Sequence, residues 1–300
     1  MIESTETMNI SCEKITADEF STYHLERLRE IPQPPTSLWL QGSPPPSGHT
    51  LLSVVGSRSY TTYGKQVVSE LIAGLRGYPI GIVSGLAKGI DGLAHRAAID
   101  AGLYTLAIPG SGLDRTVLYP AQHKSLADDI LRTGGGLLSE LEPHTRAAKW
   151  TFPQRNRLMA GLAHATLLVE AGEKSGTLIT ARMVADYNRD LLVVPGSIFS
   201  PNSLGVHQFL KLGATPITCS TDIVEALQLP VKDENFVQAT QKEVLSENET
   251  KILTALKQPI TVDALSTEID LPFEVIQITL MQLEMQDLVR VTNGLYQAKI

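Results

Sequence analysis

The sequence predicts an α/β protein with a Rossmann-like, doubly wound and mostly parallel sheet, followed by a small C-terminal winged-helix domain. Continuous apolar runs from Leu51 onward alternate with amphipathic stretches, which is typical of βαβ units whose sheet is covered on both faces. Five of these runs break into a glycine paired with serine or threonine. In a parallel sheet those five turns would share one edge, in front of helix N-termini that offer unpaired N–H groups, and such an edge binds anions.

Composition limits the classes of protein that this chain could belong to. Its 300 residues are 43% hydrophobic, enough for one large domain and a small one. No apolar stretch approaches the roughly 20 residues of a membrane helix, and the polar N-terminus predicts no secretion signal. Cys12, Cys219 and the histidines lack metal-ligand spacing. We therefore expect a cytoplasmic protein without metal, cofactor or membrane contact.

The net charge of −7 is unevenly distributed along the chain. Residues 1–47 hold 3 basic and 7 acidic side chains, and residues 230–300 hold 6 and 11. Residues 48–229 hold 16 basic and 14 acidic side chains, so the acidity belongs to the two ends. A local positive groove for nucleic acid therefore remains compatible with the middle of the chain.

Apolar periodicity and turn residues predict the elements in order. Proline clusters at 32–35 and 44–46 flank a short strand-like run at 37–40, so residues 1–47 are predicted to be a lead-in arm. Residues 48–229 are predicted to form the Rossmann-like domain. Its expected strands are 51–55, 80–83, 104–108, 137–139, 165–169, 191–194 and 215–218. Its expected helices are 63–75, 89–101, 120–132, 154–163, 176–188, 203–212 and 221–228.

The C-terminal segment has a different pattern. Residues 230–247 are polar and poor in apolar side chains, as in a linker. Residues 248–300 then contain expected helices at 248–257, 261–268 and 272–286 and a strand pair around Asn293-Gly294, a favoured hairpin turn. This order predicts a helix-turn-helix with a wing.

The first two glycine turns are candidate phosphate sites. Gly56, Ser57 and Arg58 end the first strand, and an ordinary turn with a solvated arginine is the alternative interpretation. The second block contains Gly85, Lys88 and Gly89, whose glycines suit a backbone wrapped around an oxyanion. Two further residues of this block have structural interpretations: Asp91 as a helix N-cap and His95 as a packed side chain.

A second constellation lies at a predicted helix start. Phe152, Arg155, Asn156 and Arg157 follow the aromatic residue Trp150. Arginine forks grip phosphates, and aromatic faces stack bases. The alternative is that an arginine pairs with an acidic side chain such as Glu140 or Glu170, and we expect this for at least one of the two arginines.

Ser175, Gly176 and Thr177 open the next predicted helix with two hydroxyls and a glycine. Hydroxyl and N–H donors converge there, which favours a phosphate cradle. Gly110-Ser111-Gly112 forms a similar loop without a basic residue.

These blocks together resemble a known family. VVGSRSYTTYG, SGLAKGIDGLAHRAAIDAG, IPGSGLDRTVLYP, LLSELEP, FPQRNRLMAGL, EAGEKSGTLITA, VVPG and LGVHQFLKLGA are similar, in order, to motifs of the bacterial DNA-processing protein family called DprA or Smf. The resemblance covers roughly residues 36–228. It implies a Rossmann-like domain that binds single-stranded DNA, a homodimer, and loading of RecA recombinase on DNA entering during natural transformation. It also implies DNA contacts by Arg58, by the arginine-rich motif at 155–157 and by the loop at 175–177.

Two features depart from the family pattern. Many members begin with a helical SAM-like domain, for which the arm at 1–47 is too short. The third helix of the predicted winged helix, 272–286, has no lysine or arginine and carries Glu274 and Glu284. A helix in a DNA groove needs cationic or amide donors, so partner contact or dimer support is favoured, although Gln277, Gln282 and Gln286 leave base reading open.

Other functions remain as alternatives. A dinucleotide-dependent oxidoreductase needs G-x-G-x-x-G in its first turn, and Gly56-Ser57-Arg58-Ser59-Tyr60 lacks the second glycine. A nucleotide phosphoribohydrolase resembles Pro-Gly-Gly-x-Gly-Thr followed by a glutamate, whereas Leu178, Ile179 and Thr180 follow here. A nucleotide-binding sensor stays open. Because no nucleophile with a partnered base can be assembled, we predict a protein that is not an enzyme.

Overall fold

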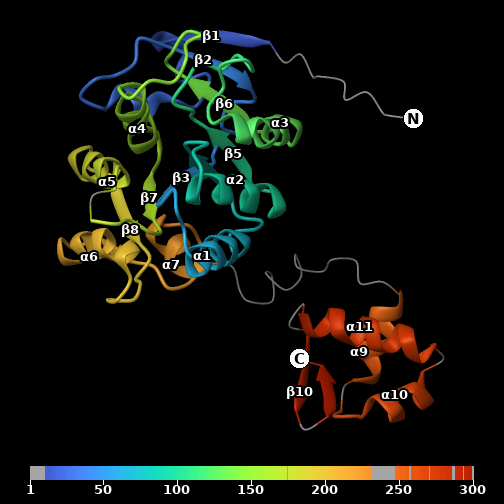
Figure 1. Ribbon diagram of the computed structural model, residues 1–300. Helices are drawn as coiled ribbons and strands as arrows, with labels where there is room; N and C mark the ends of the chain where they lie inside the picture. The colour runs from blue at the N-terminus through green and yellow to red at the C-terminus, as the bar shows by residue number, and fades with distance from the viewer. Residues whose placement is uncertain are drawn as a thin grey trace. The chain divides into compact units, whose positions relative to one another are not determined.

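The chain folds into two compact units, Met1–Asp233 and Glu234–Ile300. The computed structural model describes residues 11–173, 175–231, 247–256, 258–269, 271–285, 288–292 and 294–298 (Figure 1). Most of the predicted linker at 230–247 and Asn293 of the predicted hairpin turn lie outside the described residues.

The larger unit is built on one mixed sheet. Over the described residues its strand order is β1-β2-β6-β5-β4-β3-β7-β8-β9. The strands are β1 (Cys12–Thr16), β2 (Ser37–Gly42), β3 (Thr50–Val55), β4 (Ile80–Ser84), β5 (Tyr104–Ala107), β6 (Gly136–Ser139), β7 (Ala165–Leu168), β8 (Asp190–Val193) and β9 (Thr215–Pro216). Strands β3 to β9 pair in parallel, so the seven predicted strands and the doubly wound order are confirmed.

The N-terminal segment is more than the predicted arm. Strand β1 pairs antiparallel with β2, and β2 pairs antiparallel with β6, which extends the sheet at this edge. Ile15, Phe20 and Leu28 of the segment are fully buried in the main core. The segment buries its apolar side chains against the rest of the larger unit. The domain boundary that the sequence predicts after residue 47 therefore does not separate two compact units.

Helices cover both faces of the sheet (Figure 1). One face carries α1 (Thr62–Ala73), α2 (Ile90–Asp100), α3 (Lys124–Arg132) and α7 (Ser220–Ala226). The other carries α4 (Thr151–Leu162), α5 (Thr177–Asp186) and α6 (Leu204–Lys211), with the 3₁₀ turns η1 (Ala17–Glu19), η2 (Glu26–Arg29) and η4 (Pro201–Ser203). A further 3₁₀ turn, η3 (Ala121–His123), precedes α3. Over the described residues, none of the helices is long and apolar enough to cross a membrane.

Strand β3 shows how the sequence builds a two-sided core. Leu52 and Val54 pack into the cluster under α1 and α2, whereas Leu51 and Val55 pack into the cluster under α4 and α5. Successive side chains of a strand point to opposite faces, so a continuous apolar run is needed when both faces are covered.

The strand order fixes one special position at the sheet edge. From β3 the chain winds outward through β4, β5 and β6, and then α4 returns it to β7, on the other side of β3. The two halves of the sheet therefore diverge between β3 and β7. Such a switch point leaves a crevice at the carboxyl ends of the strands.

The smaller unit has the predicted helix-turn-helix order. It contains α9 (Glu247–Ala255), α10 (Val262–Glu268), α11 (Phe273–Met285), β10 (Val289–Thr292) and β11 (Leu295–Ala298). Strands β10 and β11 pair antiparallel as a wing, and Ile260 bridges to Tyr296. Ile252, Leu265 and Leu283 are fully buried in the small core between the helices.

Candidate functional site

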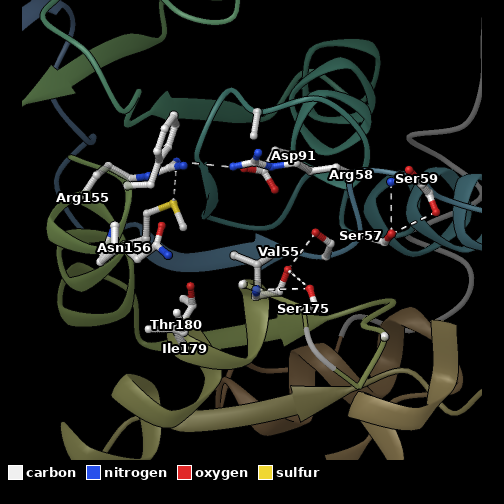
Figure 2. Close-up of a pocket in the computed structure, with 18 of the residues that line it drawn as sticks. Val55, Ser57, Arg58, Ser59, Asp91, Arg155, Asn156, Ser175, Ile179 and Thr180 are labelled. Atoms are coloured by element: carbon white, nitrogen blue, oxygen red, sulfur yellow. Dashed lines mark hydrogen bonds and ion pairs between the residues drawn. The ribbon is translucent and has the colours of Figure 1, made fainter. Parts of the chain in front are cut away.

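A cleft of about 580 Å³ opens at the switch point, beyond the ends of β3 and β7. It is lined by the turn after β3, the start of α2, the first half of α4, the loops that lead into α4 and α5, the first turn of α5 and one residue of η4. Met159, in the third turn of α4, also belongs to the lining. The lining residues are Val55, Gly56, Ser57, Arg58, Ser59, Ala87, Asp91, Lys149, Phe152, Pro153, Arg155, Asn156, Met159, Gly172, Ser175, Gly176, Thr177, Ile179, Thr180 and Asn202. Figure 2 shows how the labelled side chains of the two sheet halves meet around this space.

Arg58 is an exposed cation at the wall of the cleft. Its guanidinium carbon lies 5.3 Å from the centre of the Phe152 ring, a cation–π contact. Tyr119 packs edge-on against the same ring at 5.8 Å between centroids. Over the described residues, Arg58 forms no ion pair with a carboxylate, so its charge is directed at solvent or a ligand.

Arg155 is a second cation, held in a buried network beneath the first. Its Nη1 donates to the carbonyl of Ile108 at 2.7 Å and lies 4.0 Å from Oδ2 of Asp91 (Figure 2). Burial lowers the pKa of Arg155 to about 10, while the Asp91 carboxylate opposes that shift. Even so, the guanidinium carries its proton at neutral pH and adds positive charge to the floor of the cleft.

Asp91 neutralises part of that charge and organises the turn after β4. It is 7% exposed, and its Oδ2 accepts a hydrogen bond from the backbone N–H of Gly85 at 3.1 Å. Burial raises the pKa of the carboxyl, whereas Arg155 lowers it. The interpretation as a helix N-cap is wrong, because Gly89 precedes the first residue of α2 and Asp91 caps the preceding turn instead.

Gly85 and Gly89 shape the cleft without lining it. A Cβ on Gly85 would lie 1.5 Å from Nη1 of Arg155, so the glycine makes room for the guanidinium. Gly89 has a φ of +88°, and a Cβ there would lie 2.2 Å from the carbonyl oxygen of Ser57. The N–H of Ile90 donates to that same oxygen at 3.1 Å, which holds the turn that presents Arg58.

The turn after β7 supplies the hydroxyl side of the cleft. Oγ1 of Thr177 donates to the carbonyl of Gly56 at 3.0 Å and so ties the start of α5 to the turn after β3. Oγ of Ser175 donates to Oγ1 of Thr177 at 3.0 Å. Gly176 is exposed and has no atom within 4 Å of a Cβ built on it, so a ligand can approach the start of α5.

The structure separates Arg157 from the cleft. Its side chain is 9% exposed, its Nη2 pairs with the carboxylate of Glu140, and its Nη1 donates to the carbonyl of Gln33. Arg157 therefore joins α4 to the segment after β6 and to the N-terminal segment. The sequence predicts that at least one of the two arginines pairs with an acidic side chain and braces the fold. Arg157 does so, and Glu140 is its partner.

The remaining predicted residues divide between the lining and its surroundings. The lining includes nine of them: Gly56, Ser57, Arg58, Phe152, Arg155, Asn156, Ser175, Gly176 and Thr177. Lys88 is exposed and lies outside the lining, although it neighbours Ala87, which belongs to it. His95 is fully buried and bonded through Nδ1 to the hydroxyl of Thr105 at 2.8 Å, as expected for a packed histidine.

Sequence reasoning missed several lining residues, above all Lys149 and Asn202. Lys149 lies in the turn just before α4, three residues ahead of Phe152, and this short separation from a predicted site residue is the one sequence signal for it. Asn202 donates from Nδ2 to the carbonyl of Ser59 at 3.0 Å and braces the turn of Arg58. No sequence signal links those two distant segments.

The lining is better equipped to bind than to transfer protons. Among the described residues that line the cleft, Asp91 is the only carboxylate, and none is histidine or cysteine. Asp91 is buried and engaged with Gly85 and Arg155. The described residues contain no group of three or more His, Cys, Asp or Glu side chains that could hold a metal ion.

The fold and the cleft define a Rossmann-type α/β protein with a cationic cleft at its switch point, followed by a winged-helix unit. Residues 15–228 match the family model of DNA recombination-mediator protein A, and residues 238–294 match that of the DprA winged helix domain. The chain belongs to the DprA family of DNA-processing proteins.

Individual relatives support this assignment. The chain is 32% identical over 268 residues to Protein Smf of Escherichia coli, covering 87% of this chain and 71% of the relative. It is 38% identical over 217 residues to DNA processing protein DprA of Bacillus subtilis, covering 70% of each chain.

Two solved structures share the fold. The X-ray structure of DprA from Streptococcus pneumoniae superposes with a TM-score of 0.66 and 34% identity, covering 76% of this chain and 77% of that one. DprA from Helicobacter pylori, described as having a unique single-stranded DNA binding mode, superposes with a TM-score of 0.62 and 24% identity. That match covers 73% of this chain and 97% of the other.

Proposed function

We propose that this protein binds single-stranded DNA in the cleft at the switch point, without catalysing a reaction. The observation that carries the proposal is the contact of Arg58 with the Phe152 ring. It sets beside an aromatic face a cation that forms no ion pair with any residue the structure describes. This combination suits one phosphate and one neighbouring base, and it has no preference for sequence. The hydroxyl and N–H donors at Ser175, Gly176 and Thr177 face the same space and suit the next phosphate.

The titratable groups of the cleft lining suit a binding function better than a hydrolytic one. Cleavage of a glycosidic or phosphodiester bond needs a general acid or base with a free proton-transfer path. Asp91 is the one carboxylate of the described lining, and its hydrogen bond to Gly85 and its arginine neighbour occupy it. We therefore assign Asp91 the task of positioning Arg155.

The finer role rests on family membership. We propose that the protein acts in the cytoplasm, protects incoming single strands and loads RecA recombinase on them during natural transformation and recombination. The description of the matched family as a recombination mediator supports this role. The test is RecA filament formation on DNA covered by single-strand-binding protein, measured through RecA ATPase activity with and without this protein. An unchanged lag before ATP hydrolysis would contradict the loading role.

We also propose a homodimer. Ile198, Phe199 and Leu212 expose 73, 89 and 80% of their surfaces around α6, which is unusual for large apolar side chains. Part of the segment 204–212 is core, since Val206 and Phe209 are buried. Sedimentation of the wild type and of Phe199→Ser tests this surface, and a wild-type monomer at all concentrations would contradict the proposal.

Oligothymidylates of increasing length and a panel of mononucleotides, titrated in one buffer at several salt concentrations, test the central proposal. We expect affinity that rises with oligomer length and falls with salt, because bound phosphates release counterions. Saturable binding of a mononucleotide without binding of the oligomers would instead establish the alternative, a nucleotide sensor. Release of free base or sugar from a bound nucleotide would contradict the non-enzymatic assignment.

A further inference from the structure

Trp150 is a large aromatic side chain left in solvent next to the cleft. It exposes 59% of its surface, whereas its neighbours in sequence are either lining residues or buried anchors. Lys149 and Phe152 line the cleft, and Thr151 between them is buried. An exposed tryptophan at such a position has no role in the core of the larger unit.

The backbone that carries Trp150 is firmly held. Oγ1 of Thr151 donates to the carbonyl of Gly110 at 2.6 Å, and its N–H donates to the carbonyl of Ala148 at 3.1 Å. Trp150 itself is the N-cap residue of α4 in a helical conformation, with φ −76° and ψ −24°. The indole is thus presented from a rigid turn, which limits the entropy lost when a ligand packs on it.

Helical spacing places Trp150 at the rim. Residues three apart lie on one side of a helix, so Trp150 shares a stripe with Pro153, which lines the cleft. Lys149, adjacent in sequence, is exposed, and it forms no ion pair over the described residues. Lys149 is therefore a solvent-facing cation of the cleft lining, next to Trp150 in the chain.

We propose that Trp150 is a second stacking platform, which holds a base of the single strand just outside the cleft while Lys149 neutralises the phosphate between the two positions. This inference rests on the proposed binding of single-stranded DNA and extends its contact beyond the Arg58 and Phe152 pair. Any base can stack on an indole. The platform should therefore raise the affinity for longer oligonucleotides without creating a preference for a base sequence.

Tryptophan fluorescence provides a direct test, because the chain has two tryptophans. Trp39 is half-buried on β2 with Nζ of Lys14 5.4 Å from its ring, and Trp39→Phe leaves Trp150 as the single indole. We expect titration of this variant with oligothymidylate to quench its emission, with the same midpoint as an independent anisotropy titration. The matched variant Trp150→Phe, which keeps Trp39, should show little change in emission.

Affinity supplies the second readout. Trp150→Ala should weaken binding of a long oligothymidylate about tenfold, the effect of losing one base–aromatic stack, while Trp150→Phe should retain most of the affinity. Thermal unfolding of Trp150→Ala should match the wild type, since the side chain is exposed.

The outcomes separate the two proposals. If the wild type binds oligothymidylate but the emission of Trp150 is unchanged and Trp150→Ala binds equally well, the platform is refuted and the cleft proposal stands. If the wild type does not bind oligothymidylate at all, both proposals fall.

Discussion

Arg58 illustrates at the scale of one residue how charge is kept available for a ligand. Its turn packs closely against Gly89 and accepts a hydrogen bond from Asn202, so the guanidinium can stay over Phe152 with no carboxylate partner in the described part of the chain. The surrounding turns hold the Arg58 guanidinium in place, and a bound phosphate would neutralise its charge.

Arg58→Ala should weaken binding of single-stranded DNA by about 1.5–3 kcal/mol, the range for a hydrogen bond to a charged group. It should also reduce the slope of log K against log salt by about 0.7, the value for one phosphate contact on a single strand. Anisotropy titrations at several salt concentrations measure both quantities. The control is Arg132→Ala, since Arg132 is an exposed arginine at the end of α3 that pairs with Asp129. A fall in melting temperature with unchanged affinity would make Arg58 a structural residue.

Gly85 is a position where a single methyl group matters. Because a Cβ there would overlap Nη1 of Arg155, Gly85→Ala should displace the buried guanidinium and destabilise the fold by about 1–3 kcal/mol, the cost of overpacking. The matched control is Gly176→Ala, since the space around a Cβ on Gly176 is open and its φ is −60°. Urea unfolding compares the two variants, and equal stabilities would show that Arg155 is not held against Gly85.

At the scale of elements, α4 performs two tasks with residues two positions apart. Arg155 points to the cleft floor, while Arg157 binds Glu140 and the carbonyl of Gln33 on the segments that flank the helix. Both arginines are more than nine-tenths buried, so exposure does not separate them; their partners do.

Arg157→Met should destabilise the larger unit by about 3–5 kcal/mol, because it leaves the Glu140 carboxylate without its buried partner. The folded fraction should still bind single-stranded DNA with wild-type affinity, since the residue does not line the cleft. The double variant Arg157→Met/Glu140→Gln should recover part of the lost stability. Urea unfolding and anisotropy provide the two measurements, and weakened binding without destabilisation would contradict the bracing role.

The winged-helix unit shows a different use of a helix surface. Helix α11 exposes Ile278 and Met281 by 61 and 65%, and it carries Glu274 and Glu284 without any lysine or arginine. Favourable contact with DNA phosphates needs positive charge, so this helix is better suited to an apolar or protein surface.

Gln277→Ala/Gln282→Ala should accordingly leave the affinity for both single-stranded and duplex DNA unchanged, because neither amide can anchor an otherwise acidic helix in a groove. Anisotropy with matched single-stranded and duplex oligonucleotides measures this. A selective loss of duplex binding would establish base reading by α11.

Across the larger unit, buried titratable groups set how stability responds to pH. Burial, with a smaller contribution from His123, lowers the pKa of His95 to about 3. The unfolded chain binds this proton near pH 6.5. Between these values the unfolded state holds more protons than the folded one, so stability falls as the pH falls from about 6.5 to about 3.

His95→Gln should flatten this acid limb, since glutamine does not titrate. The difference in unfolding free energy between about pH 7 and about pH 4 should shrink by a few kcal/mol, at about 1.4 kcal/mol per pKa unit. Urea unfolding at the two pH values measures it. An identical pH dependence in the variant would show that His95 does not govern acid unfolding.

The sequence by itself determined the order of the elements, the parallel sheet and the edge on which the glycine turns meet. These features follow from the local periodicity of apolar residues and from the right-handed connection between parallel strands, both of which depend on short stretches of sequence. It also indicated nine of the residues that line the cleft, because glycine, hydroxyl and arginine blocks at strand ends have few other uses.

Only the tertiary structure decided which residues act together. The chain packs its N-terminal segment into the core as two extra strands, assigns Arg157 to Glu140 and Arg155 to the cleft floor, and brings Asn202 to the turn of Arg58. These pairings join segments from 17 residues apart, as for Arg157 and Glu140, to 143 apart, as for Asn202 and Ser59. They depend on how the layers of the fold stack, and no local pattern encodes that. The physical reason is that burial and partner geometry, which exist only in the folded chain, determine whether a charge stabilises the fold or remains available to a ligand.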